Sequence, residues 1–380
     1  MTKNTPDNDP LITLFISDLV NKWADNHVEK EEVDSSLEKY HRYILKKWAF
    51  IGICTVIMIL VIGVSLTVGE YNVGFIETYQ IIFDHITGNI TSTLKDYIII
   101  DLRMPRIVVG LIAGAGLAVA GVVMQSVLKN PLADPYTTGV SSGALFGATL
   151  AMTMGATIAS GQYSIVINAF VFSLIPTIVI MAVSKIKSAS PTVMIMAGIA
   201  VMYIFNAFTT VIKLWADPND LAGLYRWQVG SLSMASWSEM PIMLAVTFAG
   251  IVLMQIASRK LNVLSTGDEN AKAMGIDVEK MRMLCMGVVA LVSAAIVSFT
   301  GLIGFVGIVA PHVVRLFIGA DNRYLIPASM IFGMVLMISA DLVGRVVIAP
   351  TILQVGVITA FLGGPLFLWL IIRKKSSVWG

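Results

Sequence analysis

Charged residues inside apolar sequence are the first candidates for chemistry in this chain. Arg103 and Arg106 stand three residues apart, around a proline, just before a long apolar run. Asp341 and Arg345 interrupt a second apolar stretch at a spacing of four residues. Such groups are costly in a hydrocarbon layer, so each needs a partner or a place at its edge. Asp341 has two interpretations, a proton relay or an i,i+4 ion pair with Arg345, and we favour the ion pair.

Other motifs with a known chemistry are missing from the sequence. It contains no G-x-x-x-x-G-K-[ST] nucleotide-binding loop, no H-E-x-x-H pair and no cluster of cysteine and histidine. Cys54 and Cys285 both lie in apolar runs, where a cysteine is most often a small buried hydrophobe. We therefore predict no enzymatic activity, no metal site and no cofactor for this chain. Energy for any active transport must come from another subunit, unless the protein is a passive pore.

The composition defines the elements that must position these charges. The chain has 380 residues, of which 56% are hydrophobic and only 13% are charged. Its mean hydropathy is +0.81. Soluble domains carry about 25% charged residues, so this is an integral membrane protein embedded in lipid. The net charge of +2, without a basic block, gives no reason to expect a nucleic-acid partner.

Uncharged runs of sequence locate the membrane spans, because a helix needs about 20 apolar residues to cross the hydrocarbon. Two of the runs are too long for one crossing and are expected to fold back near residues 160–164 and 301–307. We predict an all-α, polytopic bundle of about ten transmembrane helices with short cytoplasmic coupling helices. The runs are 48–68, 107–128, 136–184, 188–212, 240–258, 283–314, 324–340 and 346–372.

The basic residues predict how the spans are oriented. With the N-terminus inside, 20 of the 26 lysines and arginines fall in cytoplasmic segments. This bias favours a multi-pass protein with both termini in the cytoplasm. Arg103, Arg106 and Arg345 then lie on the external side, against the trend. These arginines either bind a partner on the external side or extend to lipid phosphates.

Three regions follow from this topology. Residues 1–44 form a polar cytoplasmic extension, residues 45–375 the ten-helix membrane domain, and residues 376–380 a tail. The segment 259–282 is the largest charged loop between spans and contains "STGDENAKAMG". We predict a short helix there, with Ser265 or Thr266 as its cap and a stop at Gly275. A capped helix between two spans has the form of a docking element.

A second irregular segment is "KNPLADPYTTGVSSGA", residues 129–144. Its two prolines stop the preceding span, and a Gly/Ser-rich span follows. Asn130 and the backbone near Pro131 need hydrogen-bond partners. The segment is either an ordinary turn between helices or part of a cytoplasmic gate.

Several long motifs resemble one known family. The residues "RMPRIVVGLIAGAGLAVAGVVMQSVLKNPLADPYTTGVSSGA", "WQVGSLSMASW", "GLIGFVGIVAPHVVRLFIGADNRYLIPAS" and "QVGVITAFLGGPLFLWLIIRKK" occur in this order. They are similar to the transmembrane subunits of ATP-binding-cassette importers for ferric siderophores, haem and cobalamin. The resemblance runs from about Trp48 to the C-terminus, and the extension 1–44 is longer than the family usually has.

The resemblance implies a homodimer in the cell membrane, with two ATP-binding subunits beneath it and an external substrate-binding protein above. It implies that external arginines pair with acidic residues of the binding protein, that two segments form a cytoplasmic gate, and that the short helix couples to the ATPase. In the second gate segment, "SASPT", the proline departs from the family pattern. The implied residues are Arg103, Arg106 and Arg345 for docking; Asn130, Pro131, Leu132, Pro191 and Thr192 for the gate; and Ser265, Thr266, Asp268, Glu269, Ala271, Met274 and Gly275 for coupling.

Three functions stay open at this point. The first is an importer subunit for a ferric siderophore, with cobalamin and haem as alternative cargoes. The second is a secondary carrier or channel that works without an ATPase and uses Asp341 for ion coupling. The third is a receptor-like scaffold that signals through residues 1–44.

Overall fold

The structure is a computed structural model that describes residues 10–69, 71, 73–187, 190–234 and 236–373. The chain divides into two compact units, residues 1–50 and 51–380. The long helix α1 (Pro10–Thr67) begins in the first unit, and its last part belongs to the second. The predicted tail 376–380 lies outside the described residues.

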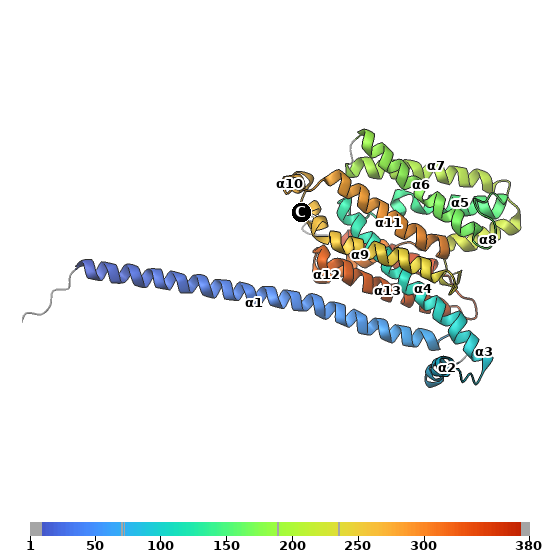
Figure 1. The fold of residues 1–380 in the computed structure, drawn as a ribbon, viewed down its shortest axis with the longest axis horizontal. Helices are drawn as coiled ribbons and strands as arrows, with labels where there is room; N and C mark the ends of the chain where they lie inside the picture. Colours follow the sequence, from blue (N-terminus) through green and yellow to red (C-terminus); the bar gives the residue numbers. More distant parts are fainter. Residues whose placement is uncertain (1–9, 70, 72, 188–189, 235, 374–380) are drawn as a thin grey trace, which may run out of the picture. The chain divides into compact units, whose positions relative to one another are not determined.

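Every regular element in the described ranges is helical (Figure 1). After α1 come α2 (Phe75–Thr87), α3 (Thr93–Asp96), the π-helical η1 (Tyr97–Arg103), α4 (Met104–Val127), the short η2 (Tyr136–Thr138), α5 (Val140–Met154), α6 (Ser164–Lys187), α7 (Pro191–Lys213), α8 (Pro218–Val229), the short η3 (Leu232–Met234), α9 (Met240–Ser265), α10 (Asp268–Ala273), α11 (Val278–Thr300), α12 (Val306–Ile318), α13 (Asn322–Val346) and α14 (Val355–Arg373).

The predicted all-α bundle is confirmed. Seven helical segments are long and apolar enough to cross a membrane, and α5, α12 and residues 355–366 of α14 are shorter apolar helices. Together they account for the predicted number of spans. Both long apolar runs are interrupted where expected, between α5 and α6 and between α11 and α12, and α5 packs against α6. The second break contains Gly301 at φ +70°, just after α11, and Phe305 at φ +68°, just before α12, and neither backbone conformation fits a right-handed helix.

Helix α4 is the centre of the membrane unit. Of its most apolar 18-residue window, 89% is buried by other helices. A helix that is apolar on all sides belongs in such an interior position. Its glycines allow close contact with neighbours: a Cβ on Gly114 would lie 2.4 Å from the carbonyl oxygen of Gly333 in α13, and one on Gly121 would lie 1.7 Å from that of Gly307 in α12. Figure 1 shows α9, α11, α12 and α13 around α4.

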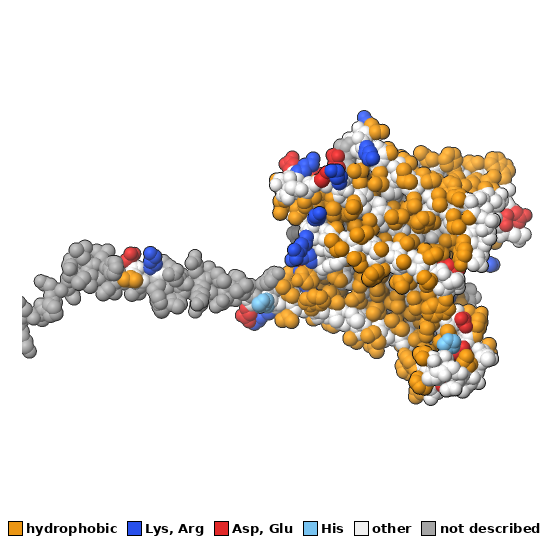
Figure 2. Space-filling view, viewed as in Figure 1, with side chains coloured by type: hydrophobic (Ala, Val, Ile, Leu, Met, Phe, Trp, Pro, Cys, Tyr) orange, Lys and Arg blue, Asp and Glu red, His pale blue; other side chains and the backbone are white. Residues whose placement is uncertain are grey.

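Charge is distributed unevenly over the surface of the membrane unit. Figure 2 shows lysine and arginine side chains gathered at the end that carries α10, which is the predicted cytoplasmic end. The wide surface between the two ends is mainly hydrophobic. This distribution is the one that the positive-inside rule predicts for a protein with α10 in the cytoplasm.

Candidate functional site

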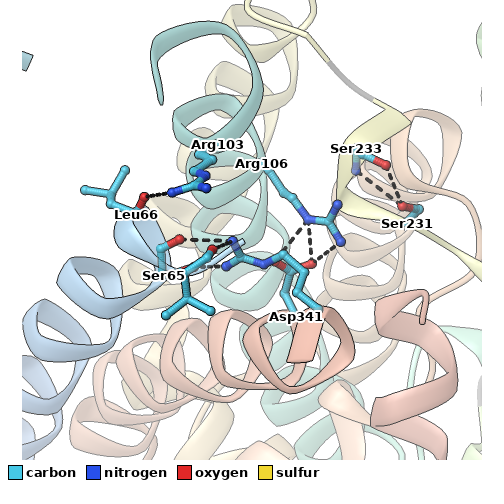
Figure 3. Close-up of polar contacts among 9 residues, drawn as sticks. Ser65, Leu66, Arg103, Arg106, Ser231, Ser233 and Asp341 are labelled. Carbon is cyan, nitrogen blue, oxygen red and sulfur yellow. Dashed lines mark hydrogen bonds and ion pairs between the residues drawn. The ribbon is translucent and has the colours of Figure 1, made fainter. Parts of the chain in front are cut away.

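Arg103, Arg106 and Arg345 come together at one end of the bundle, although they are distant in sequence. Arg103 and Arg106 lie where η1 passes into α4, and Arg345 lies in the last turn of α13. Figure 3 shows Arg106 beside Asp341, and Arg103 beside Leu66 near the end of α1. All three arginines are largely buried, with exposed fractions of 6%, 8% and 8%. They are therefore held by the chain itself rather than extended into solvent.

Asp341 is the shared anion of this cluster. Its carboxylate accepts hydrogen bonds from Nε of Arg106 at 2.8 and 3.0 Å. Nε of Arg345 lies 3.1 Å from the same carboxylate, which confirms the predicted i,i+4 ion pair. Asp341 is only 1% exposed, so two guanidinium groups enclose it. A carboxylate held in this way is suited to fixing helix ends rather than to relaying protons.

The arginines also complete the end of helix α1. Arg103 donates hydrogen bonds to the carbonyl oxygens of Leu66 and Thr67 at 2.8 and 2.7 Å. Arg345 donates to the carbonyl oxygens of Ser65 and Val68 at 3.0 and 2.8 Å. The last carbonyls of any helix lack partners within the helix and carry partial negative charge. Two arginines from other helices supply those partners here.

The same three arginines line an open pocket of about 680 Å³. Asp101 and Tyr71 stand at this pocket as well, and Asp101 is exposed. The described lining of this pocket thus combines three arginines with one acidic residue, Asp101. A carboxylate of a partner that enters it would meet guanidinium groups whose orientation is already fixed.

The first gate segment follows the end of α4 at the opposite end of the bundle. The Asn130 side chain accepts a hydrogen bond from the backbone N–H of Leu132 at 3.0 Å, which closes a tight turn over Pro131. Leu132 is 42% exposed. The partner that the sequence requires for Asn130 is therefore local. A role of these residues in gating stays a prediction.

The second gate segment begins helix α7. The Ser190 hydroxyl accepts a hydrogen bond from the Val193 N–H at 3.3 Å and caps the helix. Pro191 occupies the first helical position, where a proline is well tolerated, and Thr192 is exposed. Residues 188 and 189 of this segment lie outside the described part of the chain.

The coupling segment forms the predicted short helix α10, but the predicted cap is wrong. The residue before α10 is Gly267, and it provides no side-chain cap. The Ser265 and Thr266 hydroxyls donate instead to the carbonyl oxygens of Asn262 and Val263, because the last carbonyls of α9 need partners. Gly275, at φ +80°, follows the end of α10 as predicted.

The side chains of α10 divide into two groups. Ala271 is fully buried and supports the helix from beneath, whereas Met274 is 68% exposed. Asp268 points back into the protein and binds Lys129 and Arg282. The exposed residues of the predicted coupling set are Ser265, Thr266, Glu269, Met274 and Gly275.

Sequence reasoning missed a further site, where three interruptions of helices meet. The Ser231 N–H donates to the Thr300 carbonyl at 2.7 Å, and the Gly356 N–H donates to the Gly230 carbonyl at 3.3 Å. A pocket of about 490 Å³ lies beside them, lined by Gln228, Leu302, Gly356 and Phe361 among others. Irregular backbone at membrane depth occurs where it is enclosed or lines a cavity. In the sequence, the glycines at these breaks were the feature that could have indicated the site.

Helix α12 is short. Its 13 residues rise about 20 Å, which is less than the hydrocarbon thickness of about 30 Å. The pocket beside the break at 301–305 is open to the surface of this subunit, and Phe361 in its lining is 73% exposed. It is an apolar surface hollow beside irregular backbone.

The sequence from 57 to 373 matches the FecCD transport family. The chain belongs to this family. A Methanocaldococcus jannaschii protein named as an ABC transporter permease is 38% identical over 351 residues, which cover 90% of this chain and 99% of the relative. A hemin transport system permease protein of Yersinia pestis is 33% identical over 321 residues, which cover 84% of this chain and 95% of the relative.

A solved structure of a metal-chelate type ABC transporter, in an inward-facing conformation, has the same fold as this FecCD protein. The TM-score is 0.75 at 26% identity, and the match covers 85% of this chain and 99% of the other. Further FecCD relatives are named for cobalamin import in Halobacterium salinarum and iron(3+)-hydroxamate import in Bacillus subtilis. The chain is thus a multi-pass permease subunit of an ABC importer for an iron chelate, haem or cobalamin.

Proposed function

We propose that this FecCD permease imports a ferric siderophore across the cytoplasmic membrane. It does so as a homodimer with both termini in the cytoplasm. Two separate ATP-binding subunits supply the energy, since the chain has no nucleotide-binding loop of its own, and an external binding protein delivers the cargo. Haem and cobalamin are the alternative cargoes.

The observation that supports this function most strongly is the open apolar pocket of about 490 Å³ beside the helix breaks. Its described lining is mainly apolar, and Gln228 is its polar side chain. A wall of this kind passes a bulky chelate without holding it tightly. Iron is favoured as the cargo because several relatives are named for iron chelatin, iron(3+)-hydroxamate or Fe(3+)-citrate.

Uptake into proteoliposomes tests this function. The permease is reconstituted with the ATP-binding and substrate-binding proteins of its importer, and radiolabelled ferric siderophore, hemin and cobalamin are supplied in turn. We expect ATP-dependent uptake of the siderophore and little of the other two. Uptake of hemin or cobalamin alone would reassign the cargo, and ion-driven uptake without the ATPase would indicate a secondary carrier.

We assign the exposed face of α10 to the ATPase contact. Glu269 and Met274 offer it a charge and an apolar side chain, while buried Ala271 keeps the helix in place. Asn130, Pro131 and Leu132, with Pro191 and Thr192, remain the proposed gate.

Docking of the external binding protein is proposed at the arginine-lined pocket. An incoming carboxylate would be attracted by the arginines and repelled by Asp101, which is exposed and lines the pocket.

Asp101→Asn should therefore tighten docking of the binding protein by about twofold to fivefold at low salt, with the gain lost at high salt. Surface plasmon resonance against the immobilised permease measures it. Asp217→Asn, at an exposed aspartate that does not line the pocket, should change nothing, and equal affinities for all three proteins would remove the pocket as the docking site.

A further inference from the structure

Asp268, the first residue of α10, joins two basic side chains from distant parts of the chain. One carboxylate oxygen lies 2.6 Å from Nζ of Lys129 and 2.6 Å from Nη2 of Arg282. The other accepts a hydrogen bond from Nη1 of Arg282 at 2.9 Å. We call these three residues the α10 anchor. The two-pronged contact with Arg282 fixes both the position and the orientation of the carboxylate.

Arg282 extends the anchor to the end of the central helix. Its Nε donates a hydrogen bond at 3.2 Å to the carbonyl oxygen of Val127, the last residue of α4. Arg282 is only 1% exposed, so this guanidinium has little freedom to move independently. One rigid side chain thus contacts both α10 and the C-terminus of α4.

Lys129 extends the anchor into the first gate segment. It lies two residues after the end of α4 and directly precedes Asn130. Its φ is +50°, in the left-handed region that residues with a side chain rarely adopt. Backbone of this kind is common just after a helix end, and the Asn130 N–H closes it here on the Gln125 carbonyl at 3.2 Å. The ion pair of Lys129 with Asp268 thus joins α10 to the residue at which α4 ends and the tight turn at Asn130 begins.

The Asp268 carboxyl of the anchor stays ionised at physiological pH. The Arg282 and Lys129 side chains lower the pKa of the Asp268 carboxyl to about 2. A carboxylate with so low a pKa is ionised at any pH that the cytoplasmic side meets. Protonation of Asp268 therefore does not open this contact at physiological pH.

We infer that the α10 anchor is the mechanical link through which movement of α10 is passed to the gate segment at residues 129–132. This inference rests on the proposed function, in which the ATPase moves α10. Asp268 is then a positioning residue that acts through Lys129 and Arg282, and it does not contact the cargo. Glu269, its exposed neighbour, belongs to the face of α10 that we propose contacts the ATPase.

The test follows gate movement and transport separately in the assembled importer. Leu132→Cys places a thiol on the exposed gate residue, while the two natural cysteines, Cys54 and Cys285, are buried. Labelling of this thiol by a water-soluble maleimide, with and without ATP, then reports how accessible the gate residue is.

The variants are Asp268→Asn and the milder Lys129→Met, each made in the Leu132→Cys background and without it. Asp277→Asn is the matched control, because Asp277 lies in the same loop, pairs with Lys280 and caps α11, and asparagine caps equally well.

With Asp268→Asn we expect the ATPase to remain bound and to hydrolyse ATP, while cargo moved per ATP falls about tenfold, a size typical of coupling between sites. The ATP-dependent change in labelling should disappear, and Lys129→Met should show a smaller loss of both. Asp277→Asn should behave as the wild type. An unchanged labelling response in Asp268→Asn, with the ATPase active, would overturn the link alone. Failure of the wild-type permease to bind any ATPase would overturn the proposed function and the link together.

Discussion

Replacing Asp341 by alanine is expected to destabilise the folded permease by about 3–5 kcal/mol, the usual cost of removing one partner from a buried ion pair. The carboxylate is the shared anion of Arg106 and Arg345, at distances of 2.8 and 3.1 Å. Without it, two largely buried guanidinium groups repel each other. Arg345 also holds the end of α1, so α1, α4 and α13 would all lose support.

The thermal unfolding midpoint in detergent measures this effect. Asp101→Asn is the control, because Asp101 lies at the same pocket but is exposed, and exposed substitutions usually cost less than about 0.5 kcal/mol. The double variant Arg106→Met/Asp341→Leu should recover part of the loss, since Arg345 keeps its bonds to α1 and an apolar pair can replace a buried ion pair. Equal midpoints for Asp341→Ala and the wild type would show that the cluster does not stabilise the fold. A stable Asp341→Asn that loses ion-coupled uptake would instead support a secondary carrier.

Among the glycine-to-alanine substitutions in the described membrane unit, Gly121→Ala should destabilise the fold most. Its Cβ would lie 1.7 Å from the carbonyl oxygen of Gly307 and 2.5 Å from the carbonyl carbon. Both are backbone atoms, so no side chain can move aside, and α12 must shift away from α4. We expect a loss of about 3 kcal/mol or more, at the upper end for overpacked cores.

The matched control is Gly287→Ala. Gly287 also lies inside an apolar helix, α11, but a Cβ there meets nothing within 4 Å. Alanine should therefore be neutral, or stabilising by up to about 1 kcal/mol through helix propensity. Folding yield and unfolding midpoint in detergent compare the two variants. Similar midpoints would mean that α4 and α12 do not approach as closely as the structure shows.

The spans and their ends could be predicted because lipid imposes local rules. A segment that crosses hydrocarbon must satisfy its backbone within a helix, so apolar run length gives the number of helices. Prolines and glycines then mark the ends, as at 129–135 and 301–305. The ion pair of Asp341 with Arg345 could also be predicted, because its two residues lie one turn apart in a single helix. The predicted cap of α10 was wrong because the carbonyl groups at the end of α9 bind the Ser265 and Thr266 hydroxyls instead.

By itself, then, the sequence determined the class of protein, its membrane spans, the short helix α10, the uneven basic charge and the family, but not the helices α2, α3, η1 and α8. Only the tertiary structure decided which charges meet. Arg106 and Asp341 are separated by 235 positions, and Lys129 and Asp268 by 139. Such pairs depend on how helices pack around α4, and that packing is set by contacts of glycines and branched side chains that no local pattern encodes. The arginines thus changed from three unusual external charges to the groups that hold α1, α4 and α13 together.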